Sequence, residues 1–183
     1  MAKLIAQSPA HGIPSSTIGT VTLSELEMTS ITSIAPFAGA EAALAKALKA
    51  AHGLEWPAAG QTSEHAGARV IWAGLDLAFL TGVEASSKLA KDAALTDQSD
   101  AWARFELSGA EAADVLARLV PADLRKTQFK TGQTLRSSLG HMQMILVKTA
   151  PQSFLIMVFR SMAQTALHEL TDAMTHVAKR ASL

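Results

Sequence analysis

The pentapeptide Gly39-Ala40-Glu41-Ala42-Ala43 recurs word for word as Gly109-Ala110-Glu111-Ala112-Ala113. Each copy follows a strand-like apolar segment, residues 31–37 in the first case and residues 102–107 in the second. Each copy also opens an Ala-rich helical stretch, which is followed by a strand, a turn, a second strand and a further helix. The sequence therefore predicts the unit β-α-β-β-α twice, an α+β architecture of split β-α-β type with helices on one face of an antiparallel sheet.

Local signals place the individual elements of this repeat. The first helix is predicted over residues 41–52, with Gly53 as its left-handed cap. Ser108 and Glu111 have the spacing of a capping box for the second helix, which Pro121 would end. Short apolar runs predict strands at residues 68–72, 77–80, 93–95, 135–138, 142–148 and 154–160, with a short helix at 83–90 and a long one at 161–179.

The 183 residues fit one domain with its own core. Residues 1–28 are rich in Ser, Thr, Gly and Pro and are predicted to form an N-terminal arm, with a short strand at residues 18–23. Residues 29–183 are predicted to form a single domain of two repeats, about 29–96 and 97–183.

Composition excludes several classes of protein. With 49% hydrophobic residues, 17% charged residues and a net charge of zero, the chain resembles neither a disordered segment nor a nucleic-acid binder. The lack of cysteine excludes disulfides and thiolate metal sites. Neither a signal peptide nor an apolar run of membrane-spanning length is present, which predicts a cytoplasmic protein without membrane contact. The balanced charge favours a surface that a protein partner covers.

The basic residues are unevenly distributed. Residues 124–168 contain no acid and six bases, namely Arg125, Lys126, Lys130, Arg136, Lys148 and Arg160. This stretch either pairs with the acidic first part of the chain or docks an acidic partner or a ligand that carries a carboxylate.

The usual catalytic patterns are missing. The sequence has no Gly-rich nucleotide motif and no G-x-S-x-G nucleophile elbow. His168, Asp172 and His176 lie at i, i+4 and i+8, so they share one helix face, but a zincin helix would need a second histidine at 172. A solvated helix face gives the same pattern, and no metal ligand set is predicted. From its residues the chain has the pattern of a partner rather than of an enzyme.

Several motifs in the second half resemble one family. They are Asp97-Gln-Ser-Asp100-x-Trp102, Leu107-Ser-Gly109-x-x-Ala112-x-x-Val115-Leu-Ala-Arg-Leu119-Val-Pro121-x-Asp123-Leu124, Leu139-Gly-His-Met142 and Phe159-Arg-Ser-Met-Ala163-x-Thr165-x-x-His168-Glu-Leu170. In these motifs, and more weakly from residue 30 onward, the chain is similar to the gamma subunits of heterotetrameric sarcosine oxidases.

The resemblance implies a fold of two ferredoxin-like halves, like the folate-binding part of aminomethyltransferases. It implies an assembly with alpha, beta and delta subunits that demethylates sarcosine to glycine and passes the one-carbon unit to tetrahydrofolate. FAD, FMN, NAD and tetrahydrofolate would all be bound by the partner subunits. Aminomethyltransferases carry an essential Asp on the strand that leads into the hairpin, whereas the matching strand here holds Met142, Gln143 and Met144. The resemblance therefore implies an accessory subunit without catalytic residues or cofactors of its own.

Charge and motif density select candidate contact residues for the alpha subunit. They are Asp97, Ser99, Trp102, Arg136, His141, Arg160 and His168. Two alternatives remain, a stand-alone protein that binds folate or a one-carbon unit and a stand-alone aminomethyltransferase-like enzyme. An isolated gamma chain with an uncovered apolar surface would also be expected to form a homodimer.

Overall fold

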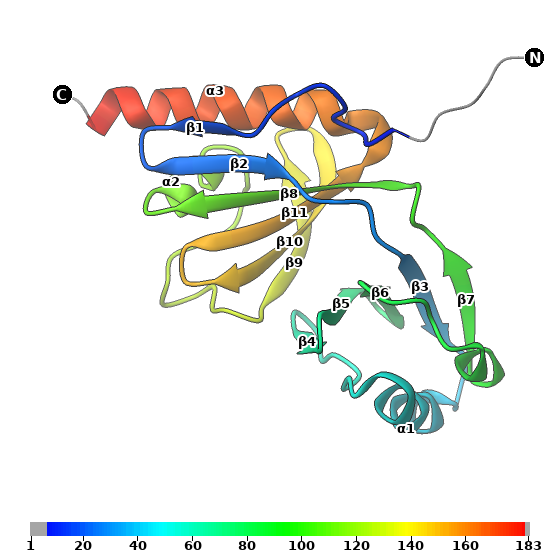
Figure 1. Cartoon of the computed structure of the whole chain (residues 1–183). Coiled ribbons are helices and arrows are strands. Elements are labelled where there is room, and N and C mark those ends of the chain that lie inside the picture. Colours follow the sequence, from blue (N-terminus) through cyan, green and yellow to red (C-terminus); the bar gives the residue numbers. More distant parts are fainter. Residues whose placement is uncertain (1–6, 182–183) are drawn as a thin grey trace, which may run out of the picture.

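Two antiparallel sheets form the framework of the protein, as the computed structural model of residues 7–181 shows (Figure 1). The first half contains β3 (Ile31–Pro36), α1 (Glu41–His52), β4 (Thr62–His65), β5 (Ala68–Gly74), β6 (Leu77–Thr81), the 3-10 helix η1 (Ser87–Lys91) and β7 (Ala93–Asp97). The remaining elements are β1 (Ser16–Ile18), β2 (Val21–Glu25), β8 (Trp102–Gly109), α2 (Ala112–Leu116), β9 (Thr134–Leu139), β10 (Met142–Ala150), β11 (Ser153–Phe159), the 3-10 helix η2 (Arg160–Met162) and α3 (Ala163–Ala181).

The strand orders confirm the internal repeat. The five-stranded sheet has the order β4-β5-β6-β3-β7 and the six-stranded sheet the order β1-β2-β8-β11-β10-β9. Strands β3, β6, β5 and β4 thus correspond one by one to β8, β11, β10 and β9. The α+β fold of two similar halves is as predicted, but the repeated unit is β-α-β-β-β-α instead of β-α-β-β-α. In the first half the sequence pattern misses β4, whereas all four strands of the second half are predicted.

The first strand of each repeat, β3 or β8, pairs on one side with a strand that comes from a different part of the chain in the two halves. In the first half β7 pairs with β3, whereas in the second half β2 pairs with β8, with Val21 opposite Gly109. The strand predicted at residues 18–23 is therefore wrong in its bounds, because Gly19, with a φ of 60°, turns the chain between β1 and β2. Over its described residues, the segment predicted as an arm is thus part of the second half.

The predicted capping box is also wrong. Ser108 lies in β8, because the strand continues through Gly109, and Glu111 forms no side-chain cap at the start of α2. The carboxylate of Glu111 instead accepts a hydrogen bond from Thr20 Oγ1 at 2.8 Å. The helix ends at Leu116, four residues before the predicted end, whereas α1 begins and ends as predicted.

The core has three apolar layers. One lies between α1 and the five-stranded sheet and another between α2, α3 and the six-stranded sheet. The third contains only strand and loop residues from both halves, among them Ile71, Phe79, Trp102 and Met157, so the two sheets pack against each other. The layers are helix, sheet, sheet, helix, and α1 and α3 lie at opposite ends of the molecule (Figure 1). Within residues 7–181 no helix is long and apolar enough to cross a membrane.

Candidate functional site at the junction of the two halves

Four of the seven predicted contact residues come together where β7 leads into β8. We call Asp97, Ser99, Trp102, Arg160 and their neighbour Phe159 the junction cluster. Ser99 donates hydrogen bonds to Asp97 Oδ1 through its hydroxyl at 2.6 Å and its backbone N–H at 2.9 Å. The hydroxyl and backbone bonds hold the pKa of the Asp97 carboxyl below its usual value.

Trp102 connects the two halves. Its ring meets Phe79 of β6 edge-on at 5.4 Å and stacks on Phe159 of β11 at 4.8 Å. Trp102 is buried, whereas Phe159 is 42% exposed. The aromatic stack therefore extends from the core to the surface, where one face of the Phe159 side chain stays uncovered.

Arg160 borders this face. Its guanidinium Nη2 donates to the carbonyl oxygen of Gln7, and its Nη1 lies 3.8 Å from the carboxylate of Asp100. Gln7, Pro9, Phe159 and Arg160 line a shallow depression at this place. The junction cluster thus offers an exposed aromatic ring beside a cation.

The three other predicted residues lie elsewhere. Arg136, on β9, donates from Nη1 to the carbonyl oxygen of Ala73 at 3.2 Å, so it links the two halves. His141 is exposed in the turn between β9 and β10. His168 is exposed on α3, where its Nε2 lies 3.3 Å from Asp172 Oδ2. The seven residues therefore do not form one surface.

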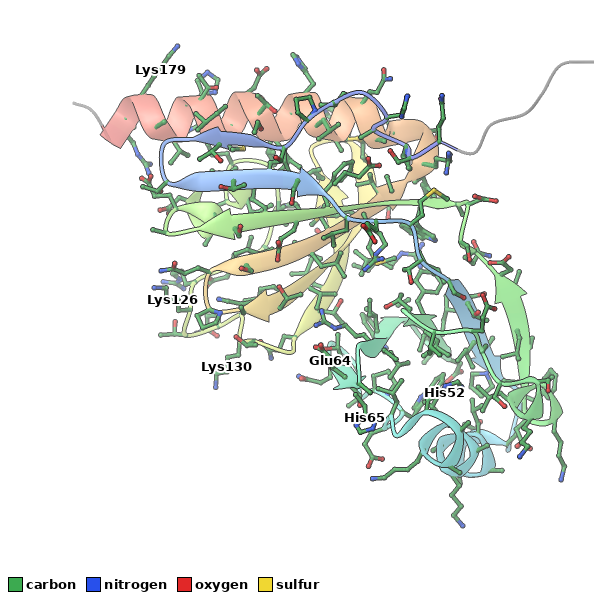
Figure 2. All side chains as sticks on the ribbon, in the orientation of Figure 1. His52, Glu64, His65, Lys126, Lys130 and Lys179 are labelled. Carbon is green, nitrogen blue, oxygen red and sulfur yellow. The ribbon has the colours of Figure 1, made fainter. Side chains whose placement is uncertain are left out.

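The acid-free stretch does not form one basic patch either. Lys148 is buried, its Nζ donates to the carbonyl oxygen of Phe129 at 2.8 Å, and the burial, followed by the charge of Lys126, lowers its pKa. Arg125 forms an ion pair with Asp123. Lys126 and Lys130 point outward from the segment before β9, far from the junction cluster (Figure 2).

The chain shows no assembled metal site in the part that the structure describes. Between residues 7 and 181, no group of three or more His, Asp or Glu side chains is placed to hold an ion. On α3, His168 and Asp172 contact each other as an exposed pair.

Phe159 is absent from the set predicted from the sequence. It ends the run Phe154-Leu-Ile-Met-Val-Phe159, in which every residue is apolar, so no alternation indicates which side chain reaches the surface. Only the break after it, at Arg160, is a signal that the strand leaves the core.

Comparison with known proteins identifies close relatives along most of the chain. No family model matches it. The gamma subunits of sarcosine oxidase from Corynebacterium sp. (strain P-1) and from Arthrobacter sp. are each 31% identical to it over 188 residues, covering 97% of this chain and 90% of the relative. The gamma subunit from Corynebacterium sp. (strain U-96) is 31% identical over 140 residues, 70% of this chain and 68% of the relative.

Solved structures give a consistent result. The heterotetrameric sarcosine oxidase from Corynebacterium sp. U-96, in complex with pyrrole 2-carboxylate, has a chain that matches with a TM-score of 0.81 and 27% identity, covering 94% of this chain and 96% of that chain. The glycine cleavage system aminomethyltransferase T from Bartonella henselae matches with a TM-score of 0.59 and 15% identity over 84% of this chain and 46% of its own, which shows a shared fold. Together with the repeated halves and the junction motifs, these similarities show that the chain belongs to the family of sarcosine oxidase gamma subunits.

Proposed function

We propose that this chain is the accessory gamma subunit of an enzyme that demethylates sarcosine to glycine and transfers the one-carbon unit to tetrahydrofolate. The observation that carries the proposal is the similarity to gamma subunits over 97% of the chain. Its partners would be alpha, beta and delta subunits, and FAD, FMN, NAD and tetrahydrofolate would be bound by those partners. This part of the proposal rests on the family resemblance.

The proposal gives the chain no catalytic residue. Strands β9 and β10, which pair with each other in the second half, contain no Asp or Glu. Met144 of β10 is buried against the helices, and its neighbour Gln143 is exposed. A neutral side chain cannot stabilise a developing positive charge as a carboxylate does. These strands therefore lack the group that an aminomethyltransferase-like reaction would need.

The junction cluster is the surface that we propose for contact with the alpha subunit. An aromatic ring that is partly exposed beside an arginine is the composition that protein interfaces favour at their centre. Arg160 would face a carboxylate of the partner, and Phe159 would enter an apolar recess. Arg136, His141 and His168 lie outside this surface.

The test is co-expression of the tagged chain with the large subunits, followed by native mass spectrometry. Phe159→Ser should reduce recovery of the complex, and Leu75→Ser serves as its matched control, because Leu75 is an apolar side chain that is 90% exposed in the turn between β5 and β6. If Leu75→Ser abolished the complex and Phe159→Ser did not, the interface would lie on the first half instead.

The alternative of a stand-alone folate-binding protein predicts a different outcome. In that case the chain would be recovered alone, as a monomer or homodimer, and would bind tetrahydrofolate without the large subunits. The likeness to aminomethyltransferase T is one of fold only, so it does not favour this alternative.

A further inference from the structure

A polar cavity of about 240 Å³ lies between the two halves, next to the apolar layer that joins the sheets. Alternation along the strands explains its position. On β8, Trp102 faces the opposite sheet, and two and four residues later Arg104 and Glu106 line the cavity. On β5, Arg69 takes the place that Ile71 and Ala73 hold in the apolar layer. Positions that would otherwise be apolar thus carry charge.

Arg104 is the central group of this cavity. Its Nη1 donates to the carbonyl oxygen of Glu27 at 3.3 Å, whereas its Nε is buried and has no hydrogen-bond partner among residues 7–181. Burial lowers the pKa of this guanidinium, and the positive charge of Arg69 lowers it further. Two guanidinium groups therefore line one cavity, and among residues 7–181 Arg69 pairs with Glu64 whereas Arg104 has no carboxylate partner. A buried guanidinium without such a partner is unfavourable, and an acceptor with a negative charge would relieve it.

A second buried donor faces the same cavity. The hydroxyl of Thr149, on β10, is buried and has no hydrogen-bond partner among the residues described. Arg69 is nearly buried, with 15% of its side chain exposed, and pairs with the exposed carboxylate of Glu64. Figure 2 shows Glu64 on the side of the first half that faces the six-stranded sheet. An unpaired guanidinium Nε and an unpaired hydroxyl are both donors to an oxygen acceptor.

The charges of the lining restrict the ligand. Glu64 and Glu106 also border the cavity, so its four charged side chains sum to zero and do not favour a strongly anionic ligand such as phosphate. A volume of 240 Å³ corresponds to about eight water molecules, which suits a molecule of a few heavy atoms. We propose that this cavity binds a small monocarboxylate, whose oxygens accept from Arg104 and Thr149 and whose remaining part is neutral or cationic.

The site is independent of the proposed function, because it can be tested on the purified full chain without any other subunit. The probes are acetate and glycine, added at constant ionic strength, and the readout is the NMR cross-peak of the Arg104 Nε–H group, assigned with Arg104→Gln. Both carboxylates should shift this peak with saturation. The Nε–H peak of Arg118, an exposed arginine outside the cavity, should stay in place.

Three variants define the contacts. Thr149→Val keeps the shape of the side chain and removes the hydroxyl, so it should weaken acetate binding severalfold while the chain stays folded. Arg104→Gln removes the reporting peak, so its binding is followed through the backbone amide peaks of Gly82 and Thr149, which line the cavity. It should weaken binding by at least about tenfold, as expected for the loss of a hydrogen bond to a charged group. Arg118→Gln is the matched control and should leave binding unchanged.

Three results would overturn the proposal. The first is an Arg104 peak that neither acetate nor glycine moves, which would mean that only water fills the cavity. The second is an equal shift with chloride, which would mean that the site does not recognise a carboxylate. The third is tighter binding of inorganic phosphate than of acetate, which would contradict the charge argument.

Discussion

Replacement of Gly109 by alanine tests how the N-terminal hairpin joins the second half. Gly109 has a φ of 132°, a conformation that side chains disfavour, and it pairs with Val21 of β2. A Cβ atom at this position would overlap the carbonyl oxygen of Thr20 and would lie 2.9 Å from the Cα atom of Val21. The obstacle is backbone, so it cannot rotate away as a flexible side chain would.

The expected cost has two parts. Strain at a positive φ costs about 1–3 kcal/mol. The backbone at Thr20 and Val21 must also retreat by about 1 Å or more, because the overlap with the carbonyl oxygen of Thr20 is deeper than the 2.9 Å contact with the Cα atom of Val21. This retreat weakens backbone hydrogen bonds between β2 and β8, worth about 1 kcal/mol each, and loosens the fully buried Val21. We expect Gly109→Ala to lower the free energy of unfolding by about 3–5 kcal/mol.

The control is Gly132→Ala, measured alongside by urea unfolding. Gly132 has a φ of 85° and nothing within 4 Å of its added Cβ, so this variant carries only the strain. Gly109→Ala should therefore be less stable than Gly132→Ala by about 2 kcal/mol. Equal stability of the two variants would refute the close approach of β2 to β8.

Three further predictions concern the core and the contact between the halves. Trp102→Ala should lower the free energy of unfolding by about 3–5 kcal/mol, measured with urea, because its ring packs on both halves. Arg136→Gln should cost about 0.5–1.5 kcal/mol by removing the bond to Ala73, without loss of the complex in native mass spectrometry. Burial lowers the pKa of Lys148 below its ordinary 10.5, so the unfolded chain holds this proton to higher pH than the folded chain does. Stability should therefore gain a contribution from Lys148 as the pH rises toward 10.5, and this contribution should be absent from pH-dependent unfolding curves of Lys148→Met.

Local signals in the sequence were sufficient for much of the fold. The repeated pentapeptide marks the same position in both halves, and the spacing of apolar residues with Gly53 fixes both ends of α1. The pairing of β2 with β8 could not be predicted, because it joins segments about 85 residues apart and strand partners leave no local period in the sequence. The false capping box at Ser108 has the same cause, since that pairing keeps the residue in a strand.

The candidate site was predictable only in part. Asp97, Ser99 and Trp102 lie within six residues of one another in one motif, so their proximity follows from the sequence, but the clustering of Arg160 with them depends on the fold. Arg104 alternates with buried residues as a solvent-facing position would, so its sequence pattern gives no sign that the other sheet covers it. The alternation of apolar and polar residues along a strand shows which side chains share a face of the sheet. It does not show whether solvent or a second sheet covers that face.

The most direct test is reconstitution of the large subunits with and without this chain, with sarcosine-dependent turnover measured per bound flavin. The chain alone should show no turnover. Variants in the second half that preserve the complex, such as Gln143→Ala and His141→Ala, should leave kcat unchanged. Turnover by the isolated chain, or loss of kcat in an intact complex with either variant, would contradict the proposal that this subunit contributes no catalytic group.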